Sequence, residues 1–67
     1  MVVLRRLRRV RESRFVTQRE LAAKAGVSHG TVVRLERGAD ARLVTARKLA
    51  AALAVEPSDL VGDDQPD

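Results

Sequence analysis

Hydrophobic positions near the start of the chain recur with a helical period. Residues 2–14 contain neither Gly nor Pro, and apolar side chains fall at three- and four-residue steps, at Val3, Leu4, Leu7 and Val10. This spacing predicts an amphipathic helix over residues 2–14 whose apolar stripe packs on a core. Its other faces carry Arg5, Arg6, Arg8, Arg9 and Arg11. The outer surface of this predicted helix is therefore strongly basic.

Two more helices are predicted immediately downstream, with a short turn between them. Thr17 and Glu20 have the spacing of a capping box, in which each side chain accepts a hydrogen bond from the other residue's amide. An apolar face follows this box, and Gly26 ends the helix. Ser28 is a good N-cap for the next helix, which we expect over residues 28–37. Its core-facing positions are Val32 and Leu35.

The last part of the chain predicts two helices and a tail. Residues 39–44 have little periodicity and are expected to form a loop, and residues 45–53 are strong helix formers. A proline and two acids favour a short fifth helix over residues 56–60. Strand patterns are absent, so we expect an all-α, compact five-helix bundle. It would form one domain over residues 1–61, followed by an acidic, disordered tail over residues 62–67.

Composition narrows the possible functions. The 67 residues include no Cys and only one His, so neither a disulfide framework nor a Cys/His metal site is expected. No nucleophile has a visible activating partner, and no phosphate-binding glycine loop is present, so we expect neither an enzyme nor a cofactor. The longest apolar run, Leu49 to Val55, is far shorter than the roughly 20 residues that cross a bilayer. We therefore expect a cytoplasmic protein without a cleaved signal peptide.

Charge is distributed very unevenly along the chain. Residues 1–48 hold all 13 Lys and Arg against four acids, a formal charge of +9, and the remaining residues carry −5. Eleven of these bases are Arg, whose rigid set of donors suits phosphate groups and guanine edges. A polyanionic partner is indicated, with nucleic acid first and an anionic membrane second. The membrane is disfavoured because the core needs the apolar stripe of the first helix.

Two short helices joined by a three-residue turn that begins with Gly are typical of a helix-turn-helix, whose second helix lies in the DNA major groove. Here the sequence resembles the Cro and phage-repressor type of helix-turn-helix domain, also called the XRE family. The resemblance covers residues 7–61. The matching residues are Val10-Arg11, Val16-Thr17-Gln18, Leu21-Ala22, Gly26-Val27-Ser28, Val32, Leu35-Glu36, Gly38, Lys48-Leu49-Ala50, Leu53, Val55 and Leu60.

The resemblance implies that four residues of the second helix of this motif face base edges, namely His29, Gly30, Val33 and Arg34. Arg34 can bond guanine O6 and N7, Val33 can pack on a thymine methyl, and His29 can bond a purine N7. The alternatives are a phosphate contact or a solvated charge for Arg34, a core position for Val33 and a solvent-facing His29. Gly30 offers no side chain, so either the helix approaches the DNA closely there or readout is weak and DNA shape carries specificity.

The resemblance also implies contacts with the DNA backbone. The residues concerned are Thr17, Gln18, Ser28, Thr31, Arg37 and Arg42. Gln18 would touch the backbone and brace the recognition helix, with an ordinary exposed position as its alternative. Ser28 and Thr31 suit capping and phosphate contact better than base reading.

Family members pair an Arg of the first helix with a Glu that ends the recognition helix, which implies a structural brace between Arg11 and Glu36. One departure from the family stands between the first two helices. Phe15, the single aromatic residue, occupies a position where Gly is usual. We expect Phe15 either to extend the first helix or to pack as a small lid.

The sequence therefore predicts a sequence-specific, repressor-like regulator that binds double-stranded DNA, occupies the nucleoid when bound, and acts as a homodimer on a two-fold symmetric operator. Leu60 and Val61 are the residues predicted for the dimer contact, and the alternative is that Leu60 completes the core. A second hypothesis is an antitoxin or adaptor module whose main role is binding a protein partner, such as a toxin or another regulator.

Overall fold

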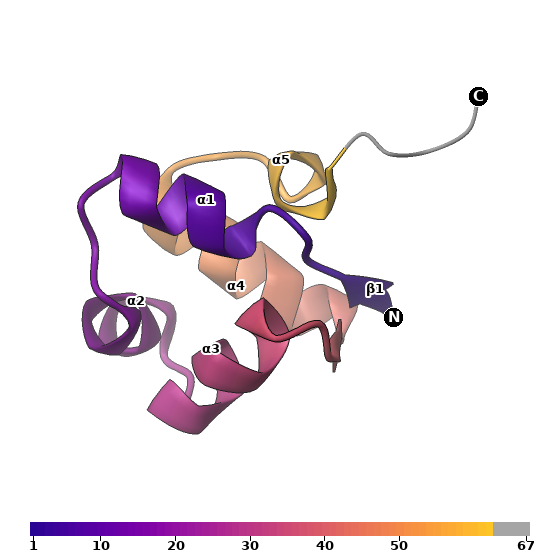
Figure 1. Cartoon of the computed structure of the whole chain (residues 1–67), viewed down its shortest axis with the longest axis horizontal. Coiled ribbons are helices and arrows are strands. Elements are labelled where there is room, and N and C mark those ends of the chain that lie inside the picture. Colours follow the sequence, from indigo (N-terminus) through magenta and orange to yellow (C-terminus); the bar gives the residue numbers. More distant parts are fainter. Residues whose placement is uncertain (63–67) are drawn as a thin grey trace.

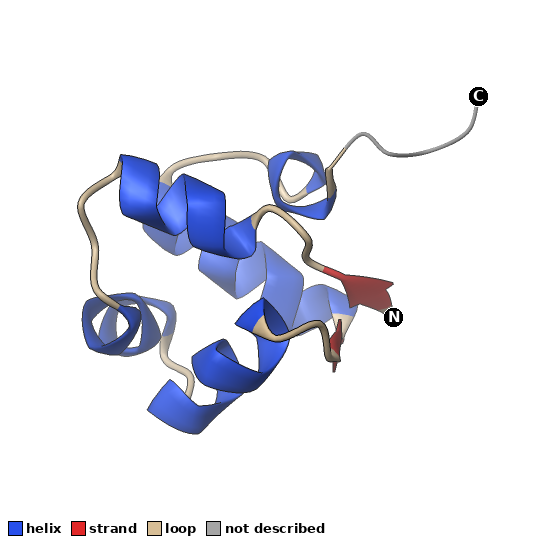
Figure 2. Ribbon diagram, viewed as in Figure 1, coloured by secondary structure: helices blue, strands red, loops and turns tan. Residues whose placement is uncertain are grey.

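The computed structural model describes residues 1–62 of the chain, and within them it contains five helices and one small sheet (Figures 1 and 2). The helices are α1 (Leu7–Ser13), α2 (Gln18–Ala25), α3 (His29–Glu36), α4 (Leu43–Leu53) and α5 (Ser58–Val61). The strands are β1 (Val2–Val3) and β2 (Asp40–Ala41). The predicted five-helix fold is confirmed, and residues 63–67 of the predicted acidic tail lie outside the described residues.

The longest helix, α4, runs through the middle of the molecule (Figure 1). Helices α1 and α5 lie together on one side of it, and α2 and α3 pack against each other on the other side. In this view α2 and α3 lie in the lower part of the molecule and α5 lies at the top, so the two helices are on the opposite side of the molecule from α5. Within residues 1–62 no helix has both the length and the hydropathy needed to cross a membrane.

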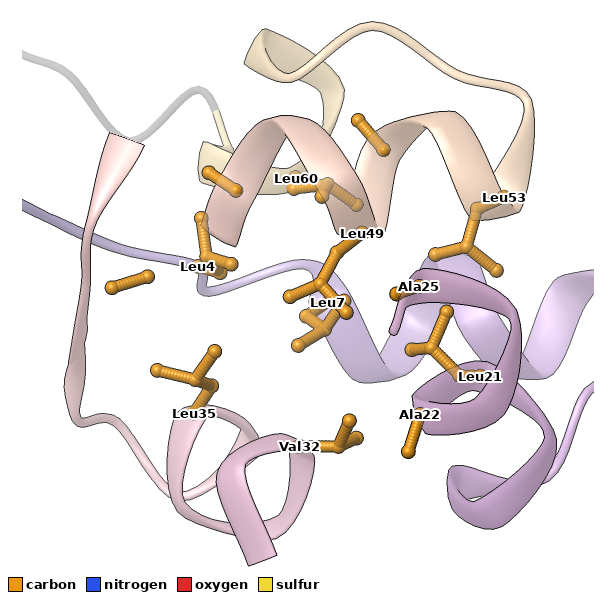
Figure 3. Packing of buried hydrophobic residues seen from close by; sticks show 13 residues of the cluster. Leu4, Leu7, Leu21, Ala22, Ala25, Val32, Leu35, Leu49, Leu53 and Leu60 are labelled. Atoms are coloured by element: carbon orange, nitrogen blue, oxygen red, sulfur yellow. The ribbon is translucent and has the colours of Figure 1, made fainter. Parts of the chain in front are cut away.

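The core is aliphatic, as the near absence of aromatic residues predicts. Leu7 of α1 and Leu49 of α4 lie at its centre, with Leu21 on the α2 side and Val32 on the α3 side (Figure 3). Each of these four side chains is fully buried. Burying such a side chain contributes about 1.5–3 kcal/mol relative to its exposed state, so the core anchors α2 and α3 on α4.

The predicted first helix begins too early. Val2 and Val3 form β1, whose residues pair antiparallel with Ala41 and Asp40 of β2. A turn follows, in which the amide of Leu7 donates to the carbonyl of Leu4 over 3.1 Å, and α1 begins only there. The two valines suit an extended backbone because their branched side chains restrict rotation in a helix. No sequence period predicts two-residue strands, so the expectation that strands are absent was also wrong.

Each of the four longer helices is followed, within two residues, by a residue with a positive φ angle. Gly26 after α2 has φ 72° and Gly38 after α3 has φ 107°. Phe15 after α1 and Ala54 after α4 adopt φ 57° and 59° without being glycines. In each case the next amide donates to the carbonyl five residues earlier, as from Val16 to Arg11 over 3.3 Å. This pattern is the Schellman motif, which satisfies the last carbonyl groups of a helix.

Phe15 therefore does neither of the things predicted for it. It ends the first helix instead of extending it, and its side chain is 94% exposed, so it covers nothing. The usual Gly fits this position because it adopts a positive φ without a Cβ clash.

The segment before α4 was only partly predicted. Of the expected loop 39–44, Asp40 and Ala41 form β2, and α4 begins at Leu43, two residues before the expected start. Arg42 occupies the N-cap position but its side chain makes no capping hydrogen bond. Without a Ser, Thr, Asp or Asn at the cap, the sequence gives no signal for the start of this helix.

Candidate nucleic-acid interface

Helix α3 has one buried face and one outward face. Val32 and Leu35 point into the core, and at about 100° per residue the opposite side of the helix is centred on Gly30. Val33 and Arg34 lie on either side of Gly30 on this outward face. Gly30 and Arg34 are exposed, and Val33 is half-buried. The structure therefore brings together on one face three of the four residues predicted to read bases.

The fourth residue, His29, opens α3 and is half-buried. By helical spacing it lies beside Val33, four residues further along, and not at the centre of the outward face. Val33 is not among the apolar residues that pack against the core. Its predicted alternative as a core residue is therefore wrong, because its side chain borders a polar hollow instead.

The predicted brace between Arg11 and Glu36 is present. Arg11 donates from Nε to Glu36 Oε2 over 2.5 Å and from Nη2 to Oε1 over 3.1 Å, and the two side chains are 10% and 5% exposed. The remaining Nη1 of Arg11 donates to the carbonyl of Val16 over 2.8 Å. The hydrogen bond to Glu36 is the main cause of a raised pKa for Arg11, which burial opposes. This two-point geometry fixes the end of α3 against α1 and the start of the α2 segment.

Gln18 joins this network. Its Nε2 donates to Glu36 Oε1 over 3.0 Å, so the first residue of α2 is bonded to the last residue of α3. Gln18 is half-buried, which excludes its alternative as an ordinary exposed helix residue. The remaining Oε1 of its amide is an acceptor and its second N–H a donor, so the group can still bond a ligand.

A polar hollow of about 330 Å³ lies beside this network, and we call it the α1–α3 hollow. It is lined by Arg8, Arg11, Gln18, Val33, Glu36 and Arg37. Arg8 and Arg37 are exposed, and Arg8 donates from Nε to Glu12 over 3.1 Å. The hollow thus joins Gln18 and Arg37, both predicted to contact DNA, to Arg8, which the sequence predicts only as part of the basic surface of the first helix. Arg8 precedes Arg11 by three residues, and that helical spacing was a signal for its position.

A second polar hollow, of about 320 Å³, lies on the opposite side of α3, and we call it the α3–α4 hollow. Its lining residues are Thr31, Arg34, Leu35, Ala39, Asp40, Ala41, Arg42 and Thr45. It joins Thr31, Arg34 and Arg42, which the sequence predicts as DNA contacts. Thr45 and Asp40 were not predicted, because their position depends on β2 and on the early start of α4.

Two of the three hydroxyl residues predicted to contact the DNA backbone, Thr17 and Ser28, also act as helix caps, and the third, Thr31, contacts Ser28. Thr17 accepts from the amide of Glu20 over 3.0 Å, and its own amide donates to Glu20 Oε1 over 2.9 Å, so the predicted capping box is confirmed. The hydrogen bond from the Thr17 amide lowers the pKa of Glu20. Ser28 accepts from the amide of Thr31 over 3.0 Å, and the two hydroxyl oxygens are 2.7 Å apart. These residues therefore define where α2 and α3 begin.

The predicted dimer contact needs a correction. Leu60 is fully buried, and its carbonyl accepts from the amide of Arg6 over 2.9 Å, so its side chain completes the core as the alternative stated. Val61 is half-buried and borders an apolar groove of about 230 Å³. The groove is lined by Val2, Leu43, Ala46, Arg47, Pro57, Ser58 and Val61. Leu43 is 56% exposed there, and the neighbouring Val44 is 55% exposed.

Comparisons with known proteins identify the family that has this arrangement of helices. The sequence profile of the helix-turn-helix family matches residues 7–60. The restriction-modification controller protein C.AhdI from Aeromonas hydrophila has a similar structure, with 38% sequence identity and a TM-score of 0.80. The alignment covers 84% of this chain and 86% of that one.

The N-terminal DNA-binding domain of the master biofilm-regulator SinR from Bacillus subtilis is also similar, with 25% identity and a TM-score of 0.78 over 98% of this chain and 97% of that one. No curated protein sequence matches the chain significantly. The family profile covers both helices of the motif, the brace between Arg11 and Glu36, and the core beneath them. The chain therefore belongs to the helix-turn-helix family of DNA-binding transcription regulators, and its resemblance to the Cro and phage-repressor type is confirmed.

Proposed function

We propose that the protein is a sequence-specific regulator that binds double-stranded DNA with α3 in the major groove. The observation that carries the proposal is the placement of the outward face of α3 between two arginine-containing polar hollows. A major groove about 12 Å wide admits an α-helix and has a phosphate strand along each edge. In this arrangement the middle of α3 faces the bases, and each hollow faces one strand.

The proposed contacts divide into two classes. Arg34 bonds guanine O6 and N7, Val33 packs on a thymine methyl, and His29 lies at the edge of the base-reading face. The groups along the flanks hold the backbone and set the orientation of α3 without reading sequence. These are Thr17, Gln18, Ser28, Thr31, Arg37 and Arg42. Their arginines give the salt dependence that phosphate contacts produce.

We further propose that the protein acts as a homodimer on a two-fold symmetric site. One 67-residue chain offers a small surface for specific recognition, and two-fold dimers of this motif read half-sites about 34 Å apart. The apolar groove beside Val61 supports this proposal, because Leu43 leaves apolar surface exposed in it and no residue of α3 lines it. Val61 remains the proposed dimer residue, and Leu60 is withdrawn because it is buried.

Selection of bound duplexes from a random pool at about 150 mM salt, near physiological screening, tests the proposal. We expect an enriched motif with two-fold symmetry, and the distance between its halves gives the half-site spacing. Sedimentation of the complex with the selected duplex counts the chains bound to it. An enriched motif without symmetry, bound by one chain, would remove the dimer from the proposal but keep sequence-specific recognition.

The second hypothesis from the sequence, an antitoxin or adaptor module, predicts the opposite result in this assay. Such a module depends on a protein partner, so the isolated chain would enrich no motif and its binding would vanish as salt rises. That result would overturn sequence-specific recognition by the chain alone.

A further inference from the structure

Gly30 stands at the centre of the outward face of α3, yet the fold does not require a glycine there. Its backbone is helical, and it is not among the glycines with positive φ, unlike Gly26 and Gly38. A Cβ atom built on Gly30 would meet only Nη1 of Arg34, at 3.9 Å, an ordinary van der Waals distance. Glycine weakens a helix relative to alanine because it loses more backbone entropy. Gly30 therefore lowers the stability of α3, and no backbone conformation or close contact within residues 1–62 requires a glycine there.

The atom next to Gly30 belongs to the residue best suited to base reading. Arg34 lies four residues later on the same face, and its guanidinium reaches back along α3 over the first turn. The guanidinium makes no hydrogen bond or ion pair within residues 1–62. Its position over Gly30 therefore leaves all five N–H donors available for a ligand.

We propose that Gly30 is a specificity-determining residue that acts through Arg34. This inference rests on the proposed function of α3 as a recognition helix. The missing side chain leaves a space above the first turn of α3, and the Arg34 guanidinium uses this space to reach a guanine with two hydrogen bonds. A larger side chain at position 30 takes the same volume and turns the guanidinium away from the base edge.

The test uses the full chain and two variants, Gly30→Ala and Gly30→Leu, with the duplex selected by the wild type and a scrambled duplex of the same composition. Both variants replace Gly with a better helix former, so we expect the Tm to rise by roughly 2–8 °C. The Leu variant should lose about tenfold in its preference for the selected duplex, as Arg34→Ala does, and the Ala variant should lose less.

The double variant Gly30→Leu with Arg34→Ala separates action through Arg34 from a direct clash between the introduced side chain and the DNA. If Gly30 acts through Arg34, adding Gly30→Leu to Arg34→Ala changes the preference no further, because the group it displaces is already gone. If the double variant loses about as much preference relative to Arg34→Ala as Gly30→Leu loses relative to the wild type, the inference is overturned. It is also overturned if Gly30→Leu alone keeps the wild-type preference for the selected duplex.

A matched control adds the same bulk elsewhere. Ala51 is exposed near the end of α4, so Ala51→Leu should leave DNA preference unchanged. A wild type that selects no motif would instead overturn the proposed function, which keeps the two failures distinguishable.

Discussion

Arg11 and Glu36 are 25 positions apart in the sequence and form a two-point ion pair, with N···O distances of 2.5 and 3.1 Å, beneath the outward face of α3. Gln18 donates to the same carboxylate, so one acid holds residues from α1 and α2 against the end of α3. A buried ion pair of this kind contributes little net stability compared with apolar packing, but losing one partner leaves a charge without compensation. The pair therefore acts mainly as a constraint on the orientation of α3.

Glu36→Ala tests this constraint through stability. The substitution leaves the buried Arg11 guanidinium without its acid, so we expect the free energy of unfolding to fall by about 3–5 kcal/mol, measured by urea denaturation. Glu12→Ala is the matched control, because it removes the exposed pair with Arg8 and only a longer contact of 3.8 Å with Arg11, and should cost roughly 0.3–0.5 kcal/mol. Similar losses from both substitutions would show that the buried pair does not hold α3.

Much of the fold could be predicted from the sequence because its signals are local. The capping box at Thr17 and Glu20, the glycine after α2 and the cap at Ser28 each depend on a few neighbouring residues, and all three are present as predicted. The parts that were missed depend on contacts between distant segments. Val3 has a helical spacing with Leu7, and only the pairing of Val2 and Val3 with β2 makes this segment extended.

The candidate site also divides into parts with a signal in the sequence and parts that depend on contacts between distant segments. The resemblance to the Cro and phage-repressor type implied that His29, Gly30, Val33 and Arg34 face base edges, and the last three of these share the outward face of α3. The two hollows could not be predicted, because each combines residues from elements whose relative positions depend on packing. Leu60 shows the limit most clearly, since nothing in its local pattern distinguishes an exposed apolar residue of a short helix from one that completes the core.

Arg34→Ala should change sequence preference and not only affinity. A bidentate contact with guanine discriminates by about 1–3 kcal/mol, so the variant should accept other bases at one position of the selected duplex. Binding of a set of duplexes with single base-pair substitutions measures this. Equal weakening for every duplex would identify Arg34 as a phosphate contact instead.

Arg42→Ala should change affinity and not sequence preference. Arg42 lines the α3–α4 hollow at the start of α4, where it is proposed to contact a phosphate. Its loss should weaken binding about equally for all duplexes and reduce the slope of log K against log salt by about one. Lys48→Ala removes an exposed charge from α4 outside both hollows and should leave the slope unchanged. Relaxed preference at one base pair in the Arg42 variant would contradict its assignment to the backbone.

The capping box gives α2 a dependence on acid pH. The Thr17 amide lowers the pKa of Glu20 from its ordinary value of 4.5, so the folded state binds this proton less readily than the unfolded chain. The resulting stability is fully present above pH 4.5 and is lost as the pH falls through the lower pKa of the folded state. Glu20→Gln removes the titrating group but keeps an acceptor. The difference in Tm between wild type and this variant should therefore shrink between pH 7 and pH 3, and a constant difference would contradict the mechanism.

Phe15 has the positive φ of a Schellman motif and a side chain that is 94% exposed, so its replacement by Gly should relieve strain without opening the core. A left-handed conformation costs an L-residue roughly 1–2 kcal/mol, and the extra freedom of Gly in the unfolded chain offsets about 0.4–1 kcal/mol of that gain. We expect Phe15→Gly to raise the free energy of unfolding by up to about 1 kcal/mol in urea denaturation. Phe15→Ala removes the same ring but keeps the Cβ atom that causes the strain, so it should give no such gain. If both variants were stabilised equally, the exposed ring and not the backbone conformation would be the source of the cost.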